Sequence, residues 1–185
     1  MRAVTWVLLA MLSGCVSVPE PVVVNLLDEQ TGVSIRRVAE PIVLARDRRE
    51  VAAHARDYLT LVAVEVNRAG RRDLALLVYR WSTIDRRMDA ALDAAARDIV
   101  LVADGRDVWL RPRPGPLPAE LRPRAELLKP DVSDVVAIAY EIDVATLQML
   151  VEGADLAAAF RGPTAARPFR LWRDGRAALA DFLQR

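Results

Sequence analysis

The 185-residue sequence contains little of the side-chain chemistry from which metal sites and many catalytic sites are built. It has one cysteine, Cys15, and one histidine, His54. A disulfide within the chain is therefore excluded, and so are zinc sites made from several histidines or cysteines. The fold must be stabilised by burial and hydrogen bonding alone. We expect neither a metal nor another cofactor.

An excess of charge of one sign is also lacking. The chain has 26 lysines and arginines against 25 aspartates and glutamates, a formal net charge of +1. A dedicated nucleic-acid-binding domain shows a strong basic excess, so we expect no nucleic-acid partner. The sequence has no P-loop, no GxGxxG motif and no EF-hand loop.

The N-terminal apolar run, Ala3 to Leu12, is too short for a membrane-spanning helix, which needs about 20 residues. Arg2 precedes this run, and Leu12-Ser13-Gly14-Cys15 follows it. A basic start, a short apolar segment and a small-residue processing site are typical of a secretion signal. A buried core segment is the alternative, but it leaves the basic start and the closing four residues unexplained.

Those four residues, Leu12-Ser13-Gly14-Cys15, resemble the lipobox of bacterial lipoproteins. The resemblance implies cleavage between Gly14 and Cys15, a diacylglycerol on the Cys15 sulfur and usually a third acyl chain on the freed amine. Two or three acyl chains give stable attachment, because each buried methylene contributes about 0.8 kcal/mol. Lipoproteins with aspartate after the cysteine tend to stay in the inner membrane. Val16 therefore implies the outer membrane of a two-membrane bacterium, with the domain on the periplasmic face rather than the cell surface.

The chain divides into three predicted parts. Residues 1–14 are the signal peptide, and residues 15–30 form a lipidated, extended tether that contains Pro19 and Pro21. Residues 31–185 form a single β-rich globular domain. Beyond the signal, this body resembles only uncharacterised bacterial lipoproteins, a likeness that implies no activity.

Short apolar or alternating runs predict a mainly β fold. The expected strands cover residues 33–36, 42–45, 58–67, 74–82, 99–103, 108–110, 135–141, 156–160 and 169–172. We expect residues 58–67 and 74–82 to form a central hairpin, and Asp104-Gly105 to form a type I′ turn. The predicted architecture is an antiparallel sandwich or a curled sheet with two or three short helices, the last at the C-terminus.

The helices are predicted from spacing and capping residues. Residues 83–97 show a weak helical pattern, Asp143 can cap a helix that Gly153 ends, and a final helix starts near Arg176. The charged stretch Arg46–Glu50 is a turn or the start of a short helix that includes His54. Six prolines within residues 112–130 predict a long loop, which is either functional or mobile.

The sequence contains residues for two kinds of catalytic arrangement, a carboxylate pair and a serine with a histidine. Three carboxylate pairs could serve a hydrolase, and each also fits turn or cap chemistry; they are Asp28 with Glu29, Asp104 with Asp107, and Asp131 with Asp134. His54 could act with Ser34, Ser82 or Ser133, but none of these serines lies in a Gly-x-Ser-x-Gly elbow. We therefore expect no enzyme.

Arginine clusters and aromatic residues are the other candidates. The arginines are expected to form a solvated, charge-compensated rim or to contact lipid phosphates near the anchor; the clusters are Arg36-Arg37, Arg46 with Arg48-Arg49, Arg71-Arg72, Arg86-Arg87 and Arg111 with Arg113. The aromatic residues are mainly expected in the core. An exposed Trp81 beside Trp109 would instead indicate a partner or glycan surface.

Together these patterns predict a non-enzymatic envelope lipoprotein that is attached to the membrane through Cys15. It would bind or brace an envelope protein or polymer. The alternatives are an anchored hydrolase of envelope polymers that uses a carboxylate pair, and a lipid-handling module with an apolar cavity.

Overall fold

The computed structural model describes residues 23–84, 98–114, 121, 135–161 and 167–184. Within these residues there are ten strands and two helices: β1 (Val23–Asp28), β2 (Val33–Val38), β3 (Ile42–Asp47), β4 (Arg56–Arg68), β5 (Arg71–Ser82), β6 (Ile99–Ala103), β7 (Arg106–Leu110), β8 (Val136–Glu141), α2 (Val144–Glu152), β9 (Leu156–Phe160), β10 (Phe169–Arg173) and α3 (Arg176–Gln184). The strands form one antiparallel sheet that is not closed. The prediction of a mainly β fold that ends in a helix is confirmed, in its curled-sheet form.

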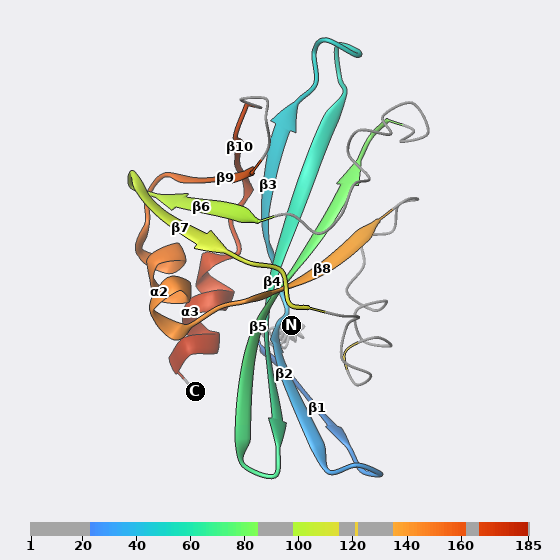
Figure 1. Cartoon of the computed structure of the whole chain (residues 1–185), viewed down its shortest axis with the longest axis vertical. Coiled ribbons are helices and arrows are strands. Elements are labelled where there is room, and N and C mark those ends of the chain that lie inside the picture. Colours follow the sequence, from blue (N-terminus) through green and yellow to red (C-terminus); the bar gives the residue numbers. More distant parts are fainter. Residues whose placement is uncertain (1–22, 85–97, 115–120, 122–134, 162–166, 185) are drawn as a thin grey trace, which may run out of the picture.

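The β4–β5 hairpin is the spine of the sheet (Figure 1). The two strands have 13 and 12 residues, and they pair from Arg68↔Arg71 to Asp57↔Ser82. Ala69 and Gly70 join them with φ angles of 50° and 88°, the positive values that a type I′ turn requires. Most residues of both strands are buried, which confirms the predicted central position.

Two strands pair with the same edge of β4, each along a different part of its length. β2 pairs with Val64–Asn67, whereas β3 pairs with Arg56–Leu61. The sheet therefore extends in two directions from the spine: to β1 at one end and through β10, β9 and β6 to β7 at the other (Figure 1). β8 continues the sheet from the far edge of β5.

The first strand corrects the predicted tether. Val23 is buried and pairs with Val38, and the ladder continues to Asp28↔Val33. The prediction of a tether over residues 15–30 is thus wrong for residues 23–28, and the globular domain begins at Val23 rather than residue 31. Residues 15–22 lie outside the described residues.

The second hairpin, β6–β7, turns at Asp104 and Gly105 as predicted, with φ angles of 50° and 75°. After β7 the chain crosses to β8: Pro112 forms a bridge with Tyr140, and the Arg113 N–H donates to the Ala139 carbonyl at 2.8 Å. Most of the predicted 112–130 loop and nearly all of the predicted 83–97 helix lie outside the described residues.

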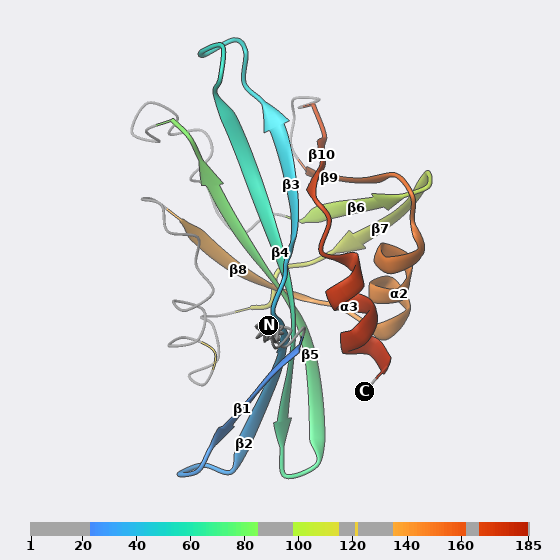
Figure 2. The ribbon, with the colours of Figure 1, turned by 180° about the vertical axis from the view of Figure 1, so that it is seen from behind.

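The two helices lie side by side against one region of the curled sheet (Figure 2). Asp143 caps α2 by accepting a hydrogen bond from the Thr146 N–H at 2.7 Å, and Gly153 ends it, as predicted. The final helix begins at Arg176 as predicted, and its Leu179 and Phe182 side chains are buried. Neither helix, in the part of the chain that the structure describes, is long and apolar enough to cross a membrane.

Candidate functional site

In two of the predicted carboxylate pairs, one member accepts hydrogen bonds from backbone N–H groups of a turn or connection. Asp104 accepts hydrogen bonds from the Ala154 and Asp155 N–H groups, at 3.2 and 2.9 Å. These bonds lower the pKa of the Asp104 carboxyl. Asp28 accepts from the Gln30 N–H at 3.1 Å. Asp131 and Asp134 lie outside the described residues.

His54 lies in the exposed turn between β3 and β4, which forms no helix, so the short-helix alternative for this stretch is wrong. The Ser82 hydroxyl donates to the Arg56 carbonyl at 3.0 Å, and Ser34 lies on β2, beside the other half of β4. Ser133 is outside the described residues. Among the residues that the structure places, no three His, Cys, Asp or Glu side chains could hold a metal ion together.

The structure instead brings basic residues together in an open groove of about 490 Å³ between β3 and β10. The groove is lined by Ala45, Arg46, Asp47, Arg56, Arg167, Pro168, Arg170, Leu171 and Trp172. Arg170 pairs with Ala45 across the β3–β10 ladder, and Asp47 pairs with Arg56 across the β3–β4 ladder. The lining thus holds four arginines and one aspartate, although the whole chain is nearly neutral.

One lining residue, Arg46, belongs to a buried ion-pair cluster that also contains Asp57 and Arg48. Asp57 is 4% exposed and accepts hydrogen bonds from Arg46 Nη2 at 2.5 Å and Arg48 Nη1 at 3.1 Å. The Arg46 guanidinium lies 4.6 Å from the Phe169 ring centroid, which is a cation–π contact. Burial alone would raise the pKa of Asp57, but hydrogen bonds from Arg46, Ser82 and Arg48 outweigh it and lower the pKa.

On the open side of the groove, Arg56 packs against a cluster of aromatic side chains. Arg56 Nε donates to Asp47 Oδ1 at 2.8 Å, and its guanidinium lies 4.5 Å from the Trp172 ring centroid. Tyr58 meets Trp172 edge-on at 6.2 Å and stacks on Trp81 at 4.0 Å. The Arg56 hydrogen bond is the main cause that lowers the pKa of Asp47.

Trp81 is half-buried, and its indole N–H donates to Thr60 Oγ1 at 3.1 Å. The predicted surface made by Trp81 and Trp109 therefore does not form, although Trp109 on β7 is exposed. Trp172 is the aromatic side chain that the groove presents to solvent, with 56% of its surface exposed. The sequence pattern 169–172 predicted its strand but did not indicate this role.

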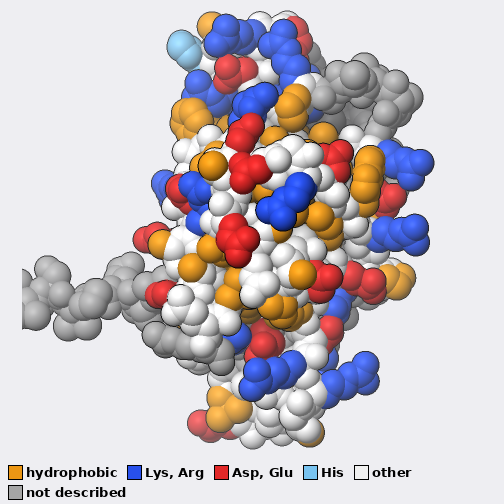
Figure 3. All heavy atoms as spheres, turned by 90° about the vertical axis from the view of Figure 1, so that its left-hand side faces the viewer, with side chains coloured by type: hydrophobic (Ala, Val, Ile, Leu, Met, Phe, Trp, Pro, Cys, Tyr) orange, Lys and Arg blue, Asp and Glu red, His pale blue; other side chains and the backbone are white. Residues whose placement is uncertain are grey.

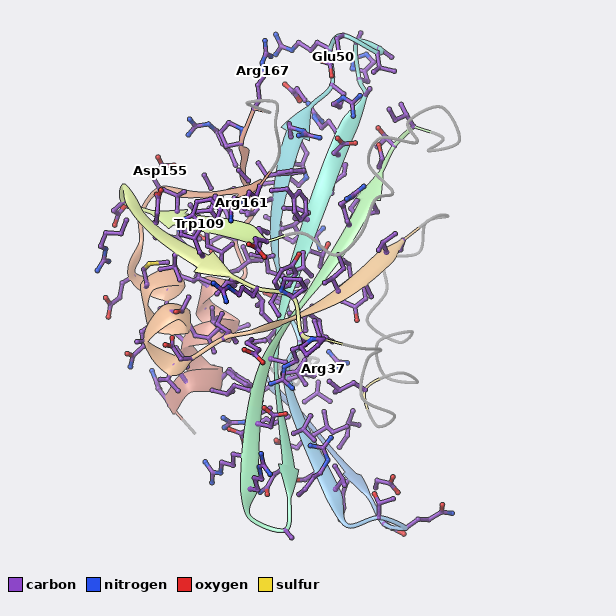
Figure 4. The ribbon with its side chains drawn as sticks, viewed as in Figure 1. Arg37, Glu50, Trp109, Asp155, Arg161 and Arg167 are labelled. Atoms are coloured by element: carbon purple, nitrogen blue, oxygen red, sulfur yellow. The ribbon has the colours of Figure 1, made fainter. Side chains whose placement is uncertain are left out.

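Arg49 adds to the arginines of the groove at the same end of the molecule, where Arg167 and Arg170 belong to the lining. Arg49 contacts Asp47 at 3.4 Å, and Arg170 contacts Asp155 at 3.6 Å, both in solvent-exposed pairs. Arg167 and Glu50 lie close to this end, beside β10 and in the β3–β4 turn (Figure 4). Figure 3 shows several arginine side chains gathered at the upper end of the molecule, with acidic side chains between them.

The predicted solvated rim is wrong for part of the arginines. Arg46 is only 12% exposed, and Arg36 is paired with the half-buried Glu65 at 3.5 Å. Arg71 and Arg72, at the turn of the β4–β5 hairpin, are exposed as predicted. Arg86 and Arg87 lie outside the described residues. Within the groove, Arg46 is largely buried and paired, whereas Arg170 is 67% exposed.

The lowered carboxyl pKa values predict how stability depends on pH. Arg113 forms a two-pronged hydrogen-bonded pair with Asp73, and this pair is the main cause that lowers the pKa of Asp73. Asp47 and Asp57 shift in the same direction. A carboxyl with a lower pKa in the folded state stabilises the fold above its unfolded pKa, and this stabilisation is lost as pH falls through the folded pKa.

We therefore expect the free energy of unfolding to fall steeply below about pH 4, where unfolded aspartates take up protons. Urea denaturation between neutral and acidic pH measures this dependence. In the variant Asp73→Asn, the free energy of unfolding should decrease less between neutral and acidic pH than in the wild type. An identical decrease in the two proteins would contradict the role of the Asp73–Arg113 pair.

Comparison with known proteins gives no match: no family model, no curated protein and no solved structure is significantly similar to this chain. A function for this chain therefore has to be proposed from its own sequence and structure.

Proposed function

We propose that this protein is an envelope lipoprotein with a non-enzymatic binding or structural role. The observation that carries the proposal is the N-terminal segment, in which Leu12-Ser13-Gly14-Cys15 follows a basic start and a short apolar run. In this proposal Cys15 carries the acyl chains and the β-rich domain faces the periplasm from the outer membrane.

The groove supports a binding role. Its four arginines keep their charge at any physiological pH, so they can bind anionic groups but cannot take up a proton as a general base. The one carboxylate in the lining, Asp47, is hydrogen-bonded to Arg56 and Arg49. The lining residues are thus suited to recognition of an anion rather than to acid–base catalysis.

The first strand also sets how far the domain can lie from its anchor. The chain between Cys15 and Val23, residues 15–22, spans at most about 26 Å even when fully extended, because each residue adds about 3.3 Å. In this proposal the domain is therefore held close to the bilayer surface, and its contacts are with components found there.

Replacing Cys15 with serine is expected to move the protein from the membrane fraction to the soluble fraction, because the oxygen cannot take the place of the lipidated sulfur. Fractionation of cells that make each variant measures the change. Ser17→Ala, just after the proposed processing site, is the matched control and should stay with the membrane.

Mass spectrometry of the N-terminal peptide provides an independent test. The proposal requires a mature chain that begins at an acylated Cys15. A bare thiol at this position, or an intact leader on the exported protein, would overturn it. Membrane association of Cys15→Ser equal to that of the wild type would do the same.

A further inference from the structure

We propose that a basic face on the domain, made of Arg49, Arg56, Arg167, Arg170 and Trp172, lies against the phosphates of anionic lipids in the membrane that holds the anchor. This inference rests on the proposed function, because the acyl chains supply the attachment. The basic face would then fix the orientation of the domain on that membrane.

The local charge is the first observation. Four arginines contribute to this face, and Arg170 and Arg49 are 67% and 75% exposed. The acids nearby are Asp47, Glu50 and Asp155, which pair with Arg56 and Arg49, with Arg48, and with Arg170. The solvent-exposed Arg49–Asp47 and Arg170–Asp155 pairs contribute little and exchange readily for other anions. Juxtamembrane arginines are attracted to anionic lipid surfaces, and the attraction decreases with salt.

The exposed tryptophan is the second observation. Trp172 is largely exposed although it is one of the largest side chains in the chain, and the Arg56 guanidinium covers one side of its ring at 4.5 Å. Val51, in the turn beside this face, is also exposed. Tryptophan side chains are enriched at the headgroup level of membranes, where an apolar ring and a polar N–H are both satisfied.

The third observation is the match between two lengths. Val24 pairs with Arg37, and Arg37 pairs with Val64, so the chain enters the sheet level with Val64, on a strand separated from β4 by β2. Arg56 lies farther along β4, about 26 Å from Val64 at about 3.3 Å per residue. Residues 15–22 have about the same reach, so an anchored Cys15 and the basic face can contact one membrane surface together.

An anionic envelope polymer is the other ligand that arginines would attract. A polymer could use the charges and stack a sugar on the exposed indole, but it would gain little from the exposed Val51 beside them. The apolar residues therefore favour a membrane surface, and polymer binding becomes an outcome of the test.

The experiment uses the purified, lipidated full-length protein in vesicles of phosphatidylcholine alone or with one third phosphatidylglycerol. Lipids brominated near the headgroup quench tryptophan fluorescence on contact. We expect quenching that requires phosphatidylglycerol and decreases with salt. Trp172→Phe should abolish it, whereas Trp109→Phe, which removes the exposed tryptophan of β7, should leave it intact.

Two double variants, each of which removes two arginine charges, test whether docking depends on the charges of the basic face. Arg167→Gln with Arg170→Gln should weaken the phosphatidylglycerol-dependent quenching about tenfold, in terms of the lipid fraction required. Arg71→Gln with Arg106→Gln removes the same charge from exposed positions outside the groove and should have little effect. Equal loss in both double variants would overturn the proposal.

The outcomes separate this inference from the anchor itself. If the protein does not float with phosphatidylcholine vesicles, the lipid anchor is wrong. If it floats but quenching is the same in both vesicles, the anchor stands and the basic face does not dock on anionic lipid. Sedimentation with isolated cell-wall polymer that requires Arg167 and Arg170, without lipid-dependent quenching, would overturn membrane docking in favour of a polymer ligand.

Discussion

Replacing Asp57 with alanine is expected to lower the free energy of unfolding by about 3–5 kcal/mol, as for other buried ion pairs that lose one partner. Asp57 is almost fully buried and is the shared acceptor for Arg46 and Arg48. The Arg46 side chain is 12% exposed and lies against the Phe169 ring, so it is largely shielded from water. The substitution would therefore leave an unpaired buried charge. Urea denaturation monitored by circular dichroism measures the loss.

Glu50→Gln is the matched control, because Glu50 also contacts Arg48 but is 61% exposed. We expect its effect on stability to be much smaller than that of Asp57→Ala, because exposed ion pairs contribute little. The double variant Arg46→Met with Asp57→Leu removes Asp57 together with its closest partner, and Arg48 keeps Glu50 as a partner, so part of the stability should be recovered. A loss for Asp57→Ala no greater than that of Glu50→Gln would show that the buried pair does not stabilise the fold.

Local sequence patterns were sufficient to predict most of the strands and both helices. Asp104-Gly105 indicates its turn because these residue types adopt positive φ at low cost. The apolar strands β4 and β5 are joined by a turn that contains Gly70, and Asp143 and Gly153 bound α2 at the residues expected from capping chemistry. Each of these signals depends only on residues that are close in sequence.

The arrangement of the strands could not be predicted in this way. β2 and β3 share one edge of β4 because that strand is long enough for both, and no local pattern encodes this. β1 was missed because it is an edge strand in which only Val23 is fully buried, so its alternation is weak. The groove joins residues 45–56 to residues 167–172, and only the β3–β10 pairing brings these segments together.

The buried ion pair did leave a signal in the sequence. Successive side chains in a strand point to opposite faces, so Arg46 shares a face with the buried Leu44, and Asp57 shares one with the buried Leu59. A basic and an acidic residue in phase with the core indicate a buried pair. The arginine-rich composition of neighbouring turns concealed this pattern and favoured a solvated rim.

Gly175→Ala is expected to destabilise the protein by about 3 kcal/mol, at the upper end of the usual cost of overpacking. Gly175 is buried between β10 and α3. A Cβ atom there would lie 2.5 Å from the carbonyl carbon and oxygen of Pro41, and 2.7 Å from the carbonyl oxygen of Glu40. These are backbone atoms of the connection that leads into β3, so no side-chain rotation can relieve the collision.

Gly153→Ala tests whether the loss at Gly175 comes from a collision with backbone atoms or from a general cost of replacing glycine. Its Cβ would meet the Ala103 Cβ at 2.7 Å, and that neighbour can be removed by Ala103→Gly. The double variant Gly153→Ala with Ala103→Gly should therefore be more stable than Gly153→Ala alone, whereas shortening side chains around Gly175 should bring no recovery. Thermal denaturation measures both effects.

Because the Gly175 carbonyl accepts the Leu179 N–H in the first turn of α3, a shift at Gly175 would also displace Leu179 and Phe182 from the core. A melting temperature for Gly175→Ala equal to that of the wild type would show that α3 does not need this close backbone contact.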